Sequence, residues 1–399
     1  MTKNTAHNSS PIKKNTSPIT HNTSPLTHYP LRIGITGQSG FIGTHLYNYL
    51  GLKENIERIG FKDGFFQNEL ELDNFISQCD VIVHLAAMNR HNDPQVIYDT
   101  NIELVNKLVA SLERTKSKAH VLMSSSTQED RDNLYGRSKK EGRELLINWA
   151  SKSNCNFTGL VIPNVFGPFG NPHYNSFIST FSHRIVNNEK PEIQIDAEID
   201  LIYVQDLVHS IYSIITEKIF ADEYRIPHTA TVKVSEVLAK LYEFNDSYVK
   251  NGIFPNLDDY FDKCLFNTFR SYLPSAFFPR NFVLHADSRG SFVETVKTMG
   301  KGQFSFSATK PGITRGNHFH LRKVERFAVI KGEALIQLRK IGTEEVINYK
   351  LSGNNPGYVD MPVWFTHNIS NIGEDELITL FWINEFFDPD DQDTYYEKV

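Results

Sequence analysis

The sequence predicts an α/β domain with a doubly wound parallel sheet, followed by a smaller domain made only of strands. The stretch "LRIGITGQSGFIGTHLYNYL" reads as a strand, a glycine-rich turn and a helix, which is how such α/β domains begin. Further on, the chain changes to short β-branched runs separated by glycine and proline turns, which indicates an all-β fold. A length of 399 residues also exceeds one ordinary hydrophobic core and fits two folded units.

We expect four segments: a disordered tail at residues 1–30, the α/β domain at 31–270, a linker at 271–282 and the all-β domain at 283–399. The tail contains the seven-residue units "NSSPIKK", "NTSPITH" and "NTSPLTH". The proline in each unit removes a helix hydrogen bond, so the repeat does not predict a coiled coil. The linker "SYLPSAFFPRNF" combines two prolines with clustered aromatic residues.

Charge and composition exclude several classes of function. The net charge of -6 is spread along the chain without the basic stripe of nucleic-acid-binding proteins, so we expect no nucleic-acid partner. Cys79, Cys155 and Cys264 lie far apart and form no metal-binding or disulfide framework. No stretch reaches the roughly 18 apolar residues of a membrane span, and the N-terminus lacks the apolar core of a signal peptide. We therefore expect a cytoplasmic protein without membrane association.

The glycines of the first turn, Gly37, Gly40 and Gly43, suit a dinucleotide. Glycine lets the backbone approach a pyrophosphate closely, and the helix that follows aims its N-terminus at the negative charge. Phe41 and Ile42 lie between these glycines, so we expect them to contact the cofactor too. Glycines at this spacing also occur in ordinary turns. The motifs that follow must therefore decide whether this turn binds a dinucleotide.

Two further strands are predicted in "DVIVHLAAMNR" and "HVLMSSSTQ". Their continuous apolar runs are typical of parallel strands that are buried on both faces. Leu85 and Ala86 follow the first run directly. The small alanine side chains there permit a cofactor to approach, so we expect Leu85 and Ala86 to contact it. The second run ends in a serine cluster.

A proton-transfer pair follows at Tyr135 and Lys139 in "LYGRSKKEG". Residues at i and i+4 share one helix face, so the lysine ammonium can lie near the phenol and lower the pKa of that phenol. Such a phenol can pass a proton to an alkoxide that forms on a substrate. A Tyr-x-x-x-Lys pair alone is common on solvated helix faces, but here it follows a glycine turn, a buried strand and the serine cluster.

These motifs, in this order, resemble an extended short-chain dehydrogenase acting on nucleotide sugars, over residues 31 to about 270. The later segments "IPNVFGP" and "IDLIYVQDLVHSI" are similar to the same family. The resemblance implies a Rossmann fold, with Tyr135 as the acid/base and Lys139 on the nicotinamide ribose. It also implies a serine hydroxyl bonded to the substrate oxygen, for which Ser126 aligns best and Ser125 is the alternative.

The choice of cofactor depends on the end of the second strand, "IERIGFKDG". A 2′-phosphate attracts cations, for which Arg58 and Lys62 are the candidates. The ribose hydroxyls of NADH favour an acidic residue instead, and Asp63 stands nearby. We expect NADPH.

The all-β domain carries metal-ligand spacing in "GNHFHLRKVERF". Alternate residues of a strand face the same way, so His318 and His320 point inward, where Glu325 of the next strand can join them. These distances reproduce the first motif of a cupin, a double-stranded β-helix or jelly-roll barrel, and "GYVDMPVWFTHNISN" resembles the second motif with His367 as the fourth ligand. Trp364 stands where that motif usually has glycine. Three imidazoles and a carboxylate suit zinc, although iron, nickel or manganese would also accept them.

The pairing of the two domains resembles the CapF-type enzymes of bacterial capsule and O-antigen synthesis along residues 31–399, including "DSRGSFVE", "KPGITRGNHFH" and "WINEFFDPD". The resemblance implies a bifunctional enzyme for a UDP-amino-sugar, UDP-2-acetamido-2,6-dideoxy-hexos-4-ulose. The cupin would epimerise C3, and the NADPH-dependent dehydrogenase would then reduce C4 to the L-talose product.

Two other interpretations stay open. In the first, the cupin is structural and the dehydrogenase alone acts as a simple 4-keto reductase or epimerase. In the second, the chain is a sensor that binds NADPH and a sugar nucleotide, although intact Ser126, Tyr135 and Lys139 argue against it. Dehydrogenases and cupins of these kinds commonly pair through helices or strand edges, so by analogy we expect a homodimer.

Overall fold

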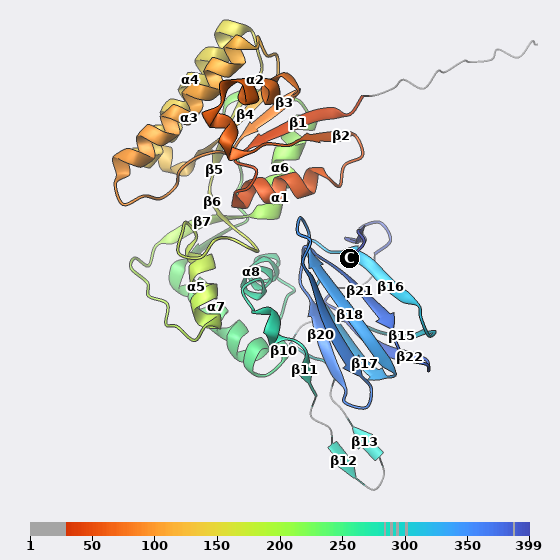
Figure 1. Ribbon diagram of the computed structural model, residues 1–399. Coiled ribbons are helices and arrows are strands. Elements are labelled where there is room, and N and C mark those ends of the chain that lie inside the picture. Colours follow the sequence, from red (N-terminus) through yellow and green to blue (C-terminus); the bar gives the residue numbers. More distant parts are fainter. Residues whose placement is uncertain (1–28, 283–284, 288–289, 293–294, 300–301, 386–387) are drawn as a thin grey trace, which may run out of the picture.

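The computed structural model describes residues 29–282, 285–287, 290–292, 295–299, 302–385 and 388–399. Figure 1 shows a helical α/β part joined to an all-β part. The predicted disordered tail lies almost entirely outside the described residues. Within the described ranges, no helix is both long enough and apolar enough to cross a membrane.

Six parallel strands form the first sheet, in the order β2-β1-β3-β4-β5-β8. These strands are β1 (Leu31–Thr36), β2 (Ile56–Ile59), β3 (Val81–His84), β4 (His120–Ser126), β5 (Phe157–Ile162) and β8 (Ala221–Arg225). Their side chains alternate between two cores, so Ile82 packs on one face while Val81 and Val83 pack on the other. The predicted parallel α/β sheet is confirmed. Its strand order reverses beside β1, and ligands of such sheets bind at the carboxyl ends of the strands at that point.

Helices cover both faces of this sheet (Figure 1). One face carries α2 (Glu69–Ser77), α3 (Pro94–Arg114) and α4 (Leu134–Ser153), and the other carries α1 (Phe41–Leu50) and α6 (Val204–Thr216). The local sequence determines where α3 begins. The Asp93 side chain caps the helix by accepting a hydrogen bond from the Gln95 amide, and proline occupies the first helical position. The sheet is thus buried on both sides, as its apolar strands require.

A smaller lobe and several short helices complete the α/β part. The lobe contains β6 (Asn164–Phe166), β7 (Glu198–Tyr203), β9 (Ala230–Lys233), α5 (Phe177–Val186), α7 (Val234–Phe244) and α8 (Tyr260–Arg270). The short helices are η1 (Asp63–Gln67), η2 (Thr127–Asp130), η3 (Asn245–Lys250) and η4 (Ser275–Phe277). Aromatic side chains fill much of the core of the lobe, among them Phe166, Phe244, Phe266 and Phe269.

Two five-stranded antiparallel sheets form the C-terminal part, in the orders β11-β20-β17-β22-β15 and β19-β18-β21-β16-β23. The first contains β11 (Arg280–Asn281), β20 (Gly357–Met361), β17 (Glu325–Lys331), β22 (Leu377–Ile383) and β15 (Gln303–Thr309). The second contains β19 (Val346–Ser352), β18 (Glu333–Lys340), β21 (Phe365–Asn371), β16 (Thr314–Phe319) and β23 (Tyr395–Tyr396). Shorter pairs join β10 (Ile253–Phe254) to β14 (Lys297–Thr298) and β12 (His285–Asp287) to β13 (Gly290–Phe292). The predicted all-β fold is confirmed.

The two parts share buried contacts. The apolar cluster beneath α1 and α6 includes Phe319, Leu321, Val363 and Trp364 of the all-β part. A polar contact joins Tyr248 of η3 to Asp360 of β20, whose carboxylate also pairs with Arg326 at 2.7 Å. Residues 271–282 include η4 and β11, and Phe278 packs in the cores on both sides. The α/β and all-β parts are therefore packed as one body.

Candidate functional site

A cavity of about 750 Å³ lies at the carboxyl ends of β1, β3 and β4, and the glycine turn lines it. Gly37 has a φ of +71°, and a Cβ there would lie 2.8 Å from the Ala86 backbone nitrogen, so the turn requires glycine. A Cβ on Gly43 would overlap the Gly37 carbonyl oxygen. No side chain caps the start of α1, and its first turn holds no acidic residue. Its amide groups therefore suit the pyrophosphate of a dinucleotide.

The residues predicted to bind the cofactor fall into two groups. Those that line the cavity are Gly37, Gly40, Phe41, Ile42, Gly43, Leu85, Ala86, Tyr135 and Lys139. Arg58 and Lys62 are not among the lining residues. Arg58 turns back over α1, where it lies 4.3 Å from the ring centroid of Tyr47 and donates to that residue's carbonyl oxygen. Asp63 does line the cavity, and it accepts a hydrogen bond from Ser39 at 2.9 Å.

The predicted catalytic residues meet at the start of α4. Asn133 caps this helix by accepting a hydrogen bond from a backbone amide of its first turn, which fixes the position of Tyr135. Ser126, at the end of β4, lies beside the Tyr135 phenol and acts to lower its pKa, and its hydroxyl oxygen accepts a hydrogen bond from the Gln128 amide at 3.2 Å. Lys139 lies one turn further along α4, and its Nζ donates to the Ser124 hydroxyl at 3.5 Å. The cavity wall includes all three predicted catalytic residues.

Ser125, the alternative to Ser126, has a different partner. Its hydroxyl donates to Glu129, and the same carboxylate pairs with Arg143 at 2.6 Å. This ion pair is largely buried. The Ser125 hydroxyl is therefore held away from Tyr135, which leaves Ser126 as the serine beside the phenol.

Burial dominates the electrostatics of these residues. It raises the pKa of Tyr135 to about 12, with a smaller contribution from Tyr174, while the hydrogen bond from Ser126 opposes the rise. Burial also lowers the pKa of Lys139 to about 8, against the opposing charge of Glu129. Lys139 is not among the groups that shift the pKa of the phenol, and desolvation of the phenol is the largest cause of the shift. A phenol that is protonated at neutral pH is suited to donating a proton.

Three residues that line the cavity come from the all-β part, namely Lys340, Ile341 and Trp364. Their sequence position does not connect them with the cofactor, because they stand about 300 positions beyond the glycine turn. The one local signal was Trp364 in a position that usually holds glycine. Its φ of +61° explains that preference, since the left-handed region suits glycine.

A second hollow of about 580 Å³ adjoins the first, and both are lined by Tyr174 and Phe177. Two arginines contribute to its wall. Arg90 donates to the carbonyl oxygens of His173 and Tyr174 at 2.6 and 3.2 Å. Arg184 has a buried Nε without a hydrogen-bond partner among the described residues. Cations and aromatic rings beside the catalytic cavity suit an anionic nucleotide.

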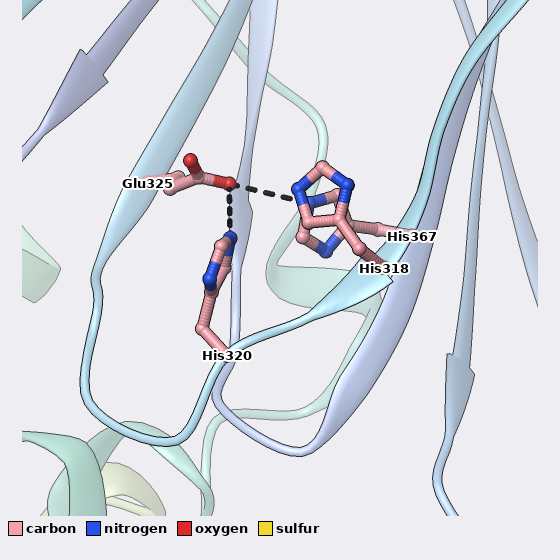
Figure 2. Close-up of side chains that lie close together, drawn as sticks. All are labelled: His318, His320, Glu325 and His367. Atoms are coloured by element: carbon pink, nitrogen blue, oxygen red, sulfur yellow. Dashed lines mark ion pairs between the residues drawn. The ribbon is translucent and has the colours of Figure 1, made fainter. Parts of the chain in front are cut away.

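The predicted metal ligands also come together. His318 lies on β16, His320 follows that strand directly, Glu325 begins β17 and His367 lies on β21. Figure 2 shows the four side chains converging from the two sheets, and their candidate ligand atoms all lie within 4.8 Å of one another. Glu325 Oε2 lies 3.0 Å from His320 Nε2 and 3.2 Å from His367 Nε2. None of these three buried atoms has a partner in hydrogen-bond geometry among the described residues, so each keeps bonding capacity for a cation.

Hydrogen bonds orient two of the imidazoles. His320 Nδ1 lies 2.6 Å from the Asp393 carbonyl oxygen, and His367 Nδ1 lies 3.2 Å from the Phe365 carbonyl oxygen. Since a carbonyl accepts, each Nδ1 carries a proton, which leaves Nε2 as the ring nitrogen that could bind a metal, as in the arrangement that metal-binding histidines show.

The charges of the cluster also favour a cation. Burial lowers the pKa of His318 to about 4, helped by His367 and His320, so this imidazole is neutral at neutral pH. Burial works to raise the pKa of Glu325, but His320 and His367 outweigh it and hold that pKa well below its usual range. A carboxylate and imidazoles are the donor set that zinc and similar metals bind.

Comparisons with known proteins agree with both halves of the chain. Residues 33–226 match the NAD dependent epimerase/dehydratase family, and residues 285–395 match the polysaccharide biosynthesis C-terminal domain. A curated relative from Pseudomonas aeruginosa, UDP-2-acetamido-2,6-beta-L-arabino-hexul-4-ose reductase, is 34% identical over 368 residues, which is 92% of this chain and 98% of the relative.

Solved structures of related proteins are also similar to this chain over most of its length. The capsular polysaccharide assembling protein CapF from Staphylococcus aureus is 36% identical, with a TM-score of 0.60, over 92% of this chain and 100% of the other. A structure of CapF with the inhibitor 3-isopropenyl-tropolone is 34% identical, with a TM-score of 0.57 and the same coverage.

Proposed function

Because this chain belongs to the family of CapF-type UDP-sugar reductases, we propose that it carries out two successive steps on one UDP-linked 4-keto sugar. The C-terminal domain, acting as a cupin, epimerises C3 of a UDP-2-acetamido-2,6-dideoxy-hexos-4-ulose. The N-terminal domain then reduces C4 to give UDP-2-acetamido-2,6-dideoxy-L-talose for capsular polysaccharide or O-antigen synthesis. The observation that supports this most is the presence, in one chain, of a Ser126–Tyr135–Lys139 cavity and a separate buried cluster of metal-ligand side chains.

Reduction uses the residues at the start of α4. A reduced nicotinamide supplies the hydride to C4. Tyr135, protonated at neutral pH, gives its phenolic proton to the oxygen that forms, while Ser126 holds that oxygen. Lys139 is positioned to hold the nicotinamide ribose and to supply positive charge while the phenol is ionised.

Epimerisation uses the acidity of C3. The C3 hydrogen lies next to the C4 ketone, so a base can remove it and a proton can return to the opposite face. A divalent cation held by His318, His320, Glu325 and His367 would stabilise negative charge at this site. Once C4 is an alcohol, C3 no longer exchanges. Epimerisation must therefore precede reduction, and reduction traps what epimerisation equilibrates.

The reductant we propose is NADPH. Lys62 and Arg58 are exposed at the end of β2, so a side-chain rotation would bring either toward a 2′-phosphate. Asp63, which lines the cavity, favours NADH as the second candidate, since a carboxylate binds ribose hydroxyls and repels a phosphate. Dissociation constants for both cofactors, measured with the wild type and with Asp63→Asn, decide between them.

The metal we propose is zinc, with iron, nickel and manganese as alternatives. Support comes from the donor set and from the inhibitor bound by the related CapF, because a tropolone carries adjacent oxygens that chelate divalent metals. Metal analysis of the purified protein identifies the ion.

The UDP moiety of the substrate is proposed to bind in the second hollow, where Arg90 and Arg184 supply positive charge. We further propose a homodimer in the cytoplasm. In support of the dimer, Phe304 and Phe306 of β15 are exposed by 59% and 72%, which makes an apolar surface among the described residues. Sedimentation of the wild type and of a Phe304→Glu/Phe306→Glu variant tests this.

The two steps are tested together by incubating the protein in D₂O with a UDP-2-acetamido-4-keto-6-deoxy sugar and following C3 by NMR. We expect deuterium at C3 without NADPH, and the C4 alcohol only with it. His318→Ala should lose C3 exchange while keeping cofactor binding, and Tyr135→Phe should lose reduction while keeping C3 exchange.

Other outcomes identify the alternatives. Reduction without C3 exchange would make the C-terminal domain structural and the chain a simple 4-keto reductase. Binding of NADPH and UDP without either reaction would indicate a sensor.

A further inference from the structure

The wall of the reductase cavity contains a cation from the other domain. Lys340 ends β18 and lines the cavity together with residues of the glycine turn and of α1. The turn after it packs on the same helix, because a Cβ on Gly342 would lie 3.7 Å from the Asn48 side chain. The turn after Lys340 thus packs near the C-terminal end of α1, and Lys340 lines the same cavity as the N-terminus of that helix.

The ammonium of Lys340 has no counter-ion in the described part of the chain. The ammonium lies over the face of Phe169, with Nζ 3.8 Å from the ring centroid. Burial lowers the pKa of Lys340, and its charge helps to lower the pKa of His45 on α1, to about 4. A half-buried cation without a carboxylate is unfavourable unless an anion joins it.

Two residues near Lys340 have a strained backbone conformation. Phe169 and Trp364 have φ values of +67° and +61°, in the left-handed region that disfavours bulky side chains. Their rings flank His45, at centroid distances of 6.3 and 5.7 Å. Strain of this kind persists only where surrounding contacts impose it, and here those contacts join the two domains.

The backbone of Trp364 forms hydrogen bonds with two other segments of the all-β part. Its carbonyl oxygen accepts a hydrogen bond from the Ile341 amide at 2.9 Å, directly after Lys340. Its own amide donates to the carbonyl oxygen of His320 at 2.9 Å. The segment that carries Lys340 is therefore tied through Trp364 to the strand end that carries a candidate metal ligand.

We propose that Lys340 binds a diphosphate in the reductase cavity, and that Trp364 positions it there. This inference rests on the proposed function, in which both the nicotinamide dinucleotide and the UDP-sugar carry a diphosphate. The glycine turn lines the same cavity, which favours the diphosphate of the nicotinamide cofactor. The C-terminal domain thereby completes the cofactor site of the N-terminal domain.

Calorimetric titration of the full chain with NADPH, NADH and UDP tests this proposal. Lys340→Met should weaken binding of both nicotinamide cofactors about tenfold or more and leave UDP binding unchanged, whereas Lys340→Arg should keep most of the affinity. Lys350→Met removes an exposed charge from the neighbouring strand β19 and should change none of the three constants. Thermal melts establish that each variant is folded.

The results separate the possible ligands. A loss for UDP alone would support a diphosphate ligand but assign it to the sugar nucleotide. Unchanged binding of all three ligands by Lys340→Met would overturn the proposal. If the wild type bound no nicotinamide cofactor, the proposed function would fail instead, and the UDP titration would still test Lys340.

Discussion

Three consecutive serines at the end of β4 have three different partners. Ser124 donates to the His84 carbonyl oxygen at 3.2 Å, Ser125 donates to Glu129, and Ser126 lies beside the Tyr135 phenol, whose pKa it acts to lower. Strand geometry explains part of this, because neighbouring side chains point to opposite faces. Only one of the three is therefore placed to share a substrate oxygen with the phenol.

A matched pair of variants follows from these partners. Ser126→Ala should lower kcat for C4 reduction by about 10²-fold, the order of effect seen when one donor to a developing oxyanion is removed. Ser125→Ala should lower the melting temperature, because it frees the buried Glu129 carboxylate of one partner, and should change kcat far less. Steady-state kinetics and thermal melts of both variants check this. Equal losses of kcat would contradict the assignment of Ser126.

The pH profile of reduction should report Lys139. Its pKa is lowered to about 8, so the ammonium is present below that pH and is lost as the pH rises above it. We therefore expect kcat/KM for reduction to fall above about pH 8, while Tyr135 stays protonated to about pH 12. Lys139→Arg, which stays charged, should shift this fall to higher pH. A profile that is flat to pH 10 in the wild type would argue against Lys139 as the titrating group.

At the scale of elements, sequence spacing predicted the site wherever one helix or one motif carries it. Tyr135 and Lys139 follow from i,i+4 spacing, and the histidine spacing in and after β16 placed His318 beside His320. Arg58 shows the limit, because backbone position does not determine where a long side chain turns. Lys340 shows another limit, since its place in the cavity depends on how two domains pack.

The C-terminal segment holds a candidate metal ligand in place. The Asp393 carboxylate accepts hydrogen bonds from the amides of Leu321, Arg322 and Lys323, at 3.1, 3.0 and 3.0 Å, and its carbonyl oxygen bonds His320. Asp393 is itself buried. This arrangement fixes the turn that directly follows His320.

Asp393→Ala should therefore affect both stability and metal binding. It leaves three amides without their acceptor, which should lower the free energy of unfolding by about 1–3 kcal/mol. It also loosens the turn that orients His320, so metal affinity should fall about 10- to 100-fold. Asp390→Ala, an exposed change in the same segment, is the control. Metal titrations and denaturant unfolding measure the two effects, and unchanged metal affinity in Asp393→Ala would count against this role.

The whole molecule should lose stability in mild acid. Burial lowers the pKa values of His45, His84 and His120 to about 4, 3 and 4, from an ordinary 6.5. As the pH falls from 6.5 toward 4, the unfolded chain takes up protons that the folded chain does not, so the free energy of unfolding falls. The slope is about 1.4 kcal/mol per pH unit for each such histidine.

Calorimetric melts between pH 7 and pH 4.5 check this expectation. His120→Gln should flatten the dependence of the melting temperature on pH, and His91→Gln, at an exposed position, should leave it unchanged. A melting temperature that stays constant over this range would contradict the prediction.

The junction of α1 with Lys340 and Trp364 also bears on how such chains can evolve. Two domains joined only by a linker can be exchanged between relatives as independent modules. Here residues of the C-terminal domain form part of the wall of the cofactor cavity in the N-terminal domain. Both domains also bury side chains in one apolar cluster. A recombinant protein that takes its two domains from different relatives would keep both folds, but the contact surfaces of the two domains would not match. We therefore expect the two domains to be inherited together.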